Sequence, residues 1–177
     1  MMGSQPPLAR AFPRFISYGW ALVPIRRGEK TPDLDLLRDM YGDTRIAHLR
    51  YAPALAGEVE LWFENEPETN LAVIPGEPSR LVVADVDRLD LLDPDLPTPT
   101  ASSGREGGGK HLYFVSERPI GTKRMPWGHI NPAYVLLPGS LHPSGRRYAW
   151  LRGRSPEDVP FQPFEGAAAA LGAELLL

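Results

Sequence analysis

The chain has 177 residues, of which 42% are hydrophobic and 23% are charged, and its formal net charge is −3. This composition is that of an ordinary globular protein with one domain. The absence of cysteine excludes a disulfide framework, a thiolate zinc site and a cysteine nucleophile. No apolar run is long enough for a membrane helix, and the first residues lack the pattern of a secretory signal, so we expect a cytoplasmic protein with no membrane partner.

Apolar periodicity and turn residues predict a mixture of helices and strands without internal repeats. In chain order, the predicted elements are a helix at 8–19, a strand at 20–25, a helix at 57–66, strands at 70–75, 80–87, 110–115, 133–138 and 147–151, and a helix at 167–177. The acidic stretch at 87–99 is predicted to be irregular.

A glycine-rich segment at 103–115, SGREGGGKHLYFV, has most of the spacing of a phosphate-binding P-loop. Gly104, Gly109 and Lys110 fit that motif, but the next residue is His where Ser or Thr is required. A P-loop opens a helix, whereas the aromatic and β-branched residues after Lys110 predict a strand. We therefore expect a strand-to-strand loop whose glycine amides form an anion-binding nest and whose Lys110 and His111 add donors. The alternative is a flexible hairpin tip with solvated charges.

Two carboxylates end the apolar run at 80–87. Asp85 and Asp87 are two residues apart, and because side chains alternate along a strand, both should point to one face, roughly 7 Å apart along the chain. Carboxylates at the end of a buried strand are costly unless a cation or hydrogen-bond donors compensate them. The pair therefore predicts a site for a divalent metal. The alternative is a strand end that enters an acidic turn, since further aspartates follow from Asp90 onward.

A Pro/Gly-rich loop between two predicted strands gathers hydroxyl, imidazole and guanidinium donors. Its polar residues are Ser140, His142, Ser144, Arg146 and Arg147. The loop belongs to a basic block, residues 101–154, that carries 9 Lys/Arg and 2 Asp/Glu. Such a block favours phosphate or nucleic-acid partners. A plain turn with a solvated basic face is the alternative.

Four strings in this order resemble the bifunctional DNA primase/polymerase (prim-pol) domain of the archaeo-eukaryotic primase superfamily, which occurs in plasmid and phage replication proteins. They are YGWALVPIRRGEKTP, NLAVIPGEPSRLVVADVD, SSGREGGGKHLYF and YVLLPGSLHPSGRRYAW. The resemblance implies an α+β fold, with an RNA-recognition-motif-like antiparallel sheet core, flanking helices and an N-terminal α/β unit. We expect residues 1–165 to form the prim-pol domain and residues 166–177 to form a C-terminal helix or linker.

The same resemblance implies template-directed nucleotidyl transfer from dNTPs or NTPs to a nucleic-acid 3′-hydroxyl. The implied cofactor is Mg²⁺ or Mn²⁺, and the implied partners are single-stranded or primed DNA and a helicase or accessory domain on a longer or separate chain. By position, Asp85 and Asp87 would hold the metal and act in catalysis together with His111. The implied nucleotide-binding residues are Lys110, His111, Ser140, His142, Gly108 and Gly109, and the expected nucleic-acid contacts are Arg105, Arg146 and Arg147.

The chain departs from the family pattern at a third acidic residue. No Asp or Glu occurs between Glu117 and Glu157, and His129 stands where the missing ligand is expected. Because imidazole binds Mn²⁺ better than Mg²⁺, we expect His129 to be a metal ligand and Mn²⁺ to be favoured. Two alternatives stay open. One is a catalytically degenerate module that binds nucleotides or nucleic acid, and the other is a metal-dependent nicking initiator, which would require paired histidines on one strand and a catalytic tyrosine.

Overall fold

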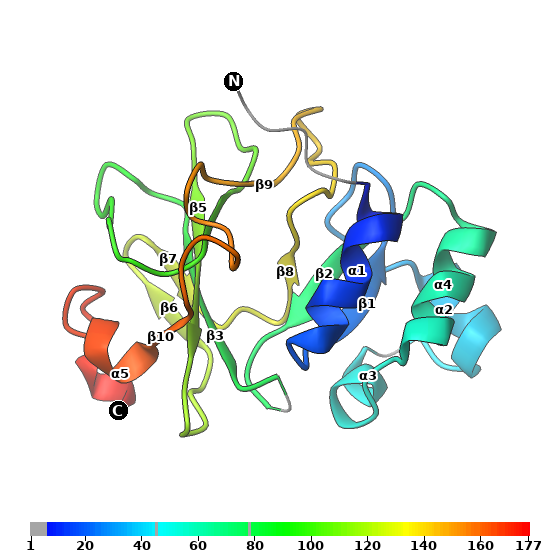
Figure 1. Cartoon of the computed structure of the whole chain (residues 1–177), viewed down its shortest axis with the longest axis horizontal. Helices are drawn as coiled ribbons and strands as arrows, with labels where there is room; N and C mark the ends of the chain where they lie inside the picture. The colour runs from blue at the N-terminus through cyan, green and yellow to red at the C-terminus, as the bar shows by residue number, and fades with distance from the viewer. Residues whose placement is uncertain (1–6, 45, 78) are drawn as a thin grey trace.

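The computed structural model describes residues 7–44, 46–77 and 79–177 and has an α+β fold (Figure 1). Its elements in chain order are α1 (Leu8–Ser17), β1 (Ala21–Ile25), α2 (Leu34–Tyr41), α3 (Ala47–Tyr51), α4 (Ala56–Asn65), β2 (Asn70–Ile74), β3 (Leu81–Val86), β4 (Thr100–Ser102), β5 (Lys110–Val115), β6 (Lys123–Met125), β7 (Gly128–Ile130), β8 (Val135–Leu136), β9 (Ala149–Trp150), β10 (Gln162–Pro163), α5 (Phe164–Ala167) and η1 (Glu174–Leu176). The predicted α+β class is confirmed, while the likeness to an RNA-recognition motif stays a prediction.

The larger sheet has the strand order β6-β7-β3-β5-β4-β9, and its neighbouring strands are antiparallel. β10 adds a short parallel pairing to β5. Side chains alternate along each strand, so the sheet has two apolar faces. In β3, Val83 belongs to one hydrophobic cluster and the adjacent Ala84 to another. The site described below lies on the face that Val83 marks.

That face packs against an N-terminal α/β unit, as predicted. In this unit a smaller antiparallel sheet has the order β1-β2-β8, and helices α1 and α4 lie beside it (Figure 1). Its core includes Trp62, which has no exposed surface. The two sheets share one hydrophobic cluster, in which the Trp20 ring stacks on Tyr113 of β5 with their centroids 5.5 Å apart. The unit is therefore fixed to the larger sheet by apolar packing.

The other face of the larger sheet is covered by the C-terminal residues. Phe164 and Leu171 are buried in the second hydrophobic cluster, and Trp127 Nε1 donates a hydrogen bond to the Leu171 carbonyl at 3.2 Å. The predicted boundary at residue 165 falls inside this layer. The continuous helix predicted at 167–177 is not formed, because α5 ends at Ala167 and the chain continues through turns into η1. Within the described residues, we find no helix that is both long and apolar enough to cross a membrane.

Candidate active site

The candidate site is built around Asp85, at the end of the central strand β3. In the antiparallel register, Asp85 stands opposite His111 of β5 on one side and His129 of β7 on the other. Directly opposed residues on neighbouring strands point to the same face of a sheet. A carboxylate is thus flanked by two imidazoles on the face that packs against the α/β unit.

Three of the predicted metal ligands come together here. Asp85, Asp87 and His129 each offer one ligand atom, and these atoms all lie within 4.8 Å of one another. All three residues are partly buried. The donor set of two carboxylates and one imidazole fits a divalent cation, and the imidazole shifts the preference from Mg²⁺ toward Mn²⁺. The residues therefore fit the metal that the sequence implied.

His111 is the partner that keeps Asp85 ionised. Its Nε2 lies 3.2 Å from Asp85 Oδ1, and its side chain is only 6% exposed. Burial by itself raises the pKa of the Asp85 carboxyl, but the charge and hydrogen bond of His111, together with the charges of His129 and Lys30, outweigh burial and lower that pKa. The Nδ1 atom of His111 is buried and has no hydrogen-bond partner among the described residues.

A second buried histidine, His142, also lies beside the Tyr148 ring. The ring centroid of Tyr148 is 5.5 Å from that of His111 and 5.6 Å from that of His142. The Ser144 N–H donates to His142 Nδ1 at 3.0 Å, so in the neutral ring Nε2 carries the proton. That Nε2 is buried and has no partner within the described part of the chain. The Nε2–H of His142 is therefore a buried donor that an acceptor atom of a ligand would satisfy.

The surroundings of His142 are positively charged. Burial is the main cause that lowers the pKa of its imidazole, and the charges of Lys30, Arg105 and His111 lower it further. These cationic groups come from separate parts of the chain, namely the turn after β1, the glycine-rich loop and β5. Cations and imidazole groups around a buried N–H donor favour an anion at that place.

Lys30 was not predicted as a site residue, although its turn was part of the first family string. Its side chain is exposed and has no ion-pair partner among the residues described, whereas its carbonyl accepts a hydrogen bond from the Tyr134 hydroxyl at 2.8 Å. That bond ties the turn to the segment that leads into β8. The sequence offers only a weak signal here, since a lysine in a polar turn is usually solvated.

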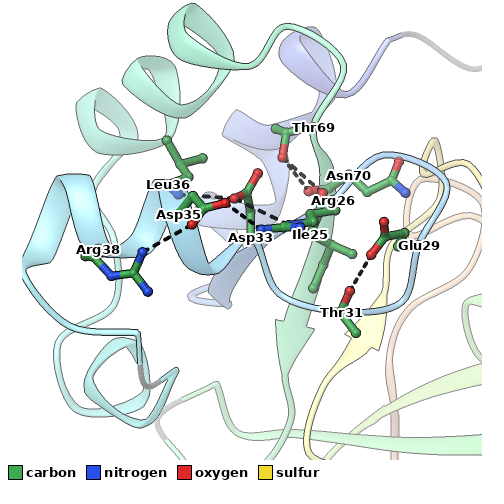
Figure 2. Close-up of polar contacts among 10 residues, drawn as sticks. All are labelled: Ile25, Arg26, Glu29, Thr31, Asp33, Asp35, Leu36, Arg38, Thr69 and Asn70. Atoms are coloured by element: carbon green, nitrogen blue, oxygen red, sulfur yellow. Dashed lines mark hydrogen bonds and ion pairs between the residues drawn. The ribbon is translucent and has the colours of Figure 1, made fainter.

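The turn that carries Lys30 is held in place by ion pairs at its base. Figure 2 shows Arg26 between two carboxylates, with its guanidinium 2.6 Å from Asp35 and 3.9 Å from Asp33. Asp33 also caps α2, because its Oδ1 accepts from the Leu36 N–H at 3.1 Å. Within the turn, the Thr31 hydroxyl donates to Glu29 at 2.7 Å (Figure 2). The base of the turn is thus fixed, and Lys30 lies close enough to the site for its charge to act on Asp85 and His142.

The glycine-rich loop connects β4 and β5 as a hairpin, which confirms the predicted strand-to-strand connection. Two glycines are required by close packing. A Cβ on Gly109 would lie 2.5 Å from Ser103 Oγ, and one on Gly104 would lie 3.2 Å from the Cβ of His142. The Gly108 N–H donates to the Arg105 carbonyl at 3.1 Å and is therefore used inside the loop. The hairpin tip rests directly on the loop that holds His142.

Comparison with known families agrees with this geometry. A family model described as "Bifunctional DNA primase/polymerase, N-terminal" (Prim-Pol) matches residues 13–162. The chain belongs to the prim-pol family. A comparison with curated proteins found no match. The prim-pol family implies nucleotide and DNA substrates and a metal-dependent nucleotidyltransferase, and the Asp85, Asp87 and His129 group gives this member a possible metal site.

Two residues that the prim-pol resemblance implied to bind nucleotide, Lys110 and Ser140, do not point toward the aspartates and histidines of the candidate site. Lys110 stands opposite Val86, on the other face of the sheet from His111, and its Nζ forms an ion pair with Asp93. Ser140 has no exposed surface, and its hydroxyl both accepts from the Leu71 N–H at 3.2 Å and donates to the Leu71 carbonyl at 3.0 Å. Its bonds join the His142 loop to β2.

The three arginines predicted to contact nucleic acid lie in the two loops above the site. Arg105 forms an ion pair with Asp87, so it lies beside the candidate metal ligands. Arg146 is exposed beside Gly104. Arg147 is also exposed, and its guanidinium donates to the Gly139 carbonyl at 2.6 Å.

Asn70 is a further residue that sequence reasoning did not assign. Its side chain is buried, donates to the Leu141 carbonyl at 2.9 Å and accepts from the Leu141 N–H at 2.8 Å. This two-way bond fixes the main chain next to His142. An asparagine at the start of a predicted strand carries no sequence signal for such a role, because the contact spans 71 positions in the chain.

Proposed function

We propose that this prim-pol domain is a primase-polymerase that transfers nucleotides from dNTPs or NTPs to the 3′-hydroxyl of a nucleic acid in plasmid- or phage-type replication. The observation that carries the proposal is the juxtaposition of two groups on one sheet face. Asp85, Asp87 and His129 form a cation site, and His111 and His142 lie beside it with Lys30 and Arg105. Nucleotidyl transfer needs this pairing of a metal site with an anion site.

Asp85, Asp87 and His129 would hold Mn²⁺ or Mg²⁺. The bound metal would lower the pKa of the attacking 3′-hydroxyl and neutralise charge on the departing pyrophosphate. The protein's own contribution is to aim both carboxylates at one point and to keep Asp85 ionised. His111 does this for Asp85 through the contact between Nε2 and Oδ1.

The phosphates of the incoming nucleotide would lie between His111, His142 and Lys30. The Nε2–H of His142 is a buried donor, and a phosphate oxygen satisfies such a donor well. A buried N–H group stabilises the extra negative charge of the transition state more strongly than a solvent-exposed one does. Ser144 and Asn70 position His142 without contacting phosphate themselves. Ser144 fixes the ring of His142, and Asn70 fixes the main chain next to it.

The exposed Arg146 and Arg147 would contact the backbone of single-stranded or primed DNA. Contacts of arginine with phosphate supply affinity without sequence preference, which a priming enzyme requires. A helicase or accessory domain, on a longer or separate chain, is the expected partner that presents the template.

A second function is favoured by one observation. The third acidic ligand is replaced by His129, so the metal site carries one negative charge fewer than a site with three carboxylates. A domain that kept the phosphate pocket and lost a metal would bind nucleotides or nucleic acid without extending a primer.

Primer extension with Mg²⁺ and Mn²⁺ side by side separates the two functions. The unmodified chain should extend a primed template in a metal-dependent way, and the double variant Asp85→Asn/Asp87→Asn should not. Asp90→Asn is the matched control, because Asp90 is exposed and paired with Arg88 outside the ligand group. Full extension by the double variant would overturn the proposal. Binding of a dNTP without extension by the unmodified chain would establish the degenerate module instead.

A further inference from the structure

Arg105 occupies a position between the two halves of the site. Its guanidinium forms an ion pair with Asp87, one of the three residues of the cation site. It also lies close enough to His142 to lower the pKa of that imidazole. The same side chain therefore contacts a candidate metal ligand and lies near His142, the residue proposed to bind phosphate.

The ion pair competes with a metal for Asp87. A carboxylate oxygen that accepts from a guanidinium has less negative charge to offer a cation, and the two positive charges repel each other. The pair is easily broken, because both side chains are substantially exposed, Arg105 by 46% and Asp87 by 35%. A metal that binds Asp87 through the oxygen paired with Arg105 would displace the guanidinium to another partner.

The exposed side chain of Arg105 can change partner by rotation about its own bonds, without movement of the loop. Gly104 and Gly107 flank this residue with φ values of 69° and 84°, in the left-handed region that glycine adopts without strain. A nucleotide whose phosphates lie beside His142 would offer the displaced guanidinium its phosphate oxygens, with which arginine forms forked hydrogen bonds.

We propose that Arg105 pairs with Asp87 when no nucleotide is bound and transfers to the nucleotide phosphates when one binds, so that nucleotide and metal favour each other's binding. The inference rests on the proposed function, since it takes the acceptor to be a triphosphate and the cation to be the catalytic metal. It assigns Arg105 to the nucleotide and metal site, where the sequence suggested only a contact with nucleic acid.

Metal binding in the absence of nucleotide tests whether Arg105 competes with the metal for Asp87. Calorimetric titration with MnCl₂ should show that Arg105→Ala binds Mn²⁺ about two- to fivefold more tightly than the unmodified chain, the range that loss of an exposed ion pair allows. Arg88→Ala is the matched control, because it also removes one arginine, from the neighbouring pair with Asp90. Its affinity for Mn²⁺ should change less than that of Arg105→Ala.

Anion binding in the absence of metal tests whether Arg105 binds phosphate once it is released from Asp87. With inorganic triphosphate as the probe and EDTA present, Asp87→Asn should bind the probe about two- to fivefold more tightly, because Arg105 is released. Asp90→Asn, which removes the same charge nearby, should gain less. In the double variant Asp87→Asn/Arg105→Ala the gain should disappear, since no guanidinium remains to be released.

These outcomes distinguish failure of the proposed role of Arg105 from failure of the proposed primase-polymerase function. Unchanged or weaker Mn²⁺ binding by Arg105→Ala, or an equal gain for triphosphate in the double variant, would overturn the role of Arg105 and leave the metal site standing. Failure of every variant and of the unmodified chain to bind Mn²⁺ would overturn both proposals.

Discussion

Asp85 and His129 lie directly opposite each other on the antiparallel strands β3 and β7. Their side chains share a face, and their ligand atoms lie within 4.8 Å of each other and of Asp87. The residue expected at the position of the absent third acid is therefore an imidazole that lies beside both carboxylates. Because the two strands approach so closely, the residue next to His129 must lack a side chain.

That requirement is at Gly128, where β7 passes the main chain of Asp85. Gly128 has a φ of 153°, and a Cβ at this position would overlap the Asp85 carbonyl oxygen. Gly128→Ala should force the strands apart, destabilise the protein by about 1–3 kcal/mol or more and weaken Mn²⁺ binding. Chemical denaturation and Mn²⁺ titration would measure both effects. Gly121→Ala is the control, since its Cβ would meet open space, and equal results for the two variants would contradict the prediction.

Ser140 is expected to act through structure and not through contact with nucleotide. Ser140→Ala would leave the buried Leu71 N–H without its acceptor, while the Leu71 carbonyl would keep its hydrogen bond from the Leu137 N–H, so the free energy of unfolding should fall by about 1–3 kcal/mol. Urea denaturation measures this loss, and the exposed Ser17 gives a control substitution with little effect. A variant at Ser140 that keeps full stability but loses dNTP affinity would show instead that the hydroxyl binds nucleotide.

His142 should make both stability and nucleotide binding depend on pH. Its folded pKa lies below the ordinary value of 6.5, so between these two values the unfolded chain binds more protons. The free energy of unfolding should therefore fall as the pH drops below about 6.5. His142→Gln, which cannot titrate, should lack this contribution, and denaturation curves at several pH values would reveal the difference.

A phosphate at His142 should reverse the preference for the neutral ring, because it stabilises the imidazolium. The unmodified chain should take up a proton when it binds triphosphate near pH 6, and its affinity should rise more steeply with falling pH than that of His142→Gln. Calorimetry in buffers of different ionisation enthalpy measures the proton uptake. Protonation of the triphosphate itself is common to both proteins, so identical uptake would contradict a phosphate contact at His142.

The sequence predicted the parts of the fold that local patterns encode. The apolar runs at 20–25, 70–75 and 80–87 are confirmed as β1, β2 and β3, and the helix at 57–66 agrees closely with α4. The short strands β4, β6, β7 and β10 were not predicted, because two or three residues carry no periodicity. They are strands only because the central sheet supplies partners. The C-terminal residues have strong helix propensity, but packing against the sheet bends them into short turns.

The sequence allowed prediction of those site residues that belong to a single strand and its end. Alternation along β3 was enough to place Asp85 and Asp87 on one face. Lys110 and Ser140 show the limit of that reasoning: neighbours on a strand point to opposite faces, and a loop serine serves the main chain as readily as a ligand. Lys30 and Tyr148 join the site only through contacts between distant segments, which no local pattern contains.

The last prediction concerns the metal that the site prefers. His129→Asp would place a third carboxylate opposite Asp85, and at separations of about 4 Å an added negative charge attracts a divalent cation by several kcal/mol even with strong screening. Mg²⁺ prefers oxygen ligands, so Mg²⁺ affinity and Mg²⁺-supported extension should rise by about tenfold or more. Without metal, three carboxylates would repel one another, so the variant should be less stable until metal is added.

His129→Asn separates the loss of imidazole from the gain of charge. It should bind Mn²⁺ more weakly than the unmodified chain without gaining Mg²⁺ affinity, because an amide is a poorer ligand than imidazole for Mn²⁺ and adds no charge. Calorimetry with each metal on the three proteins would measure these differences. Equal Mg²⁺ affinity in His129→Asp and the unmodified chain, together with strong Mg²⁺-supported extension by the latter, would place the third ligand elsewhere, with Asp90 and Asp93 as the residues to test next.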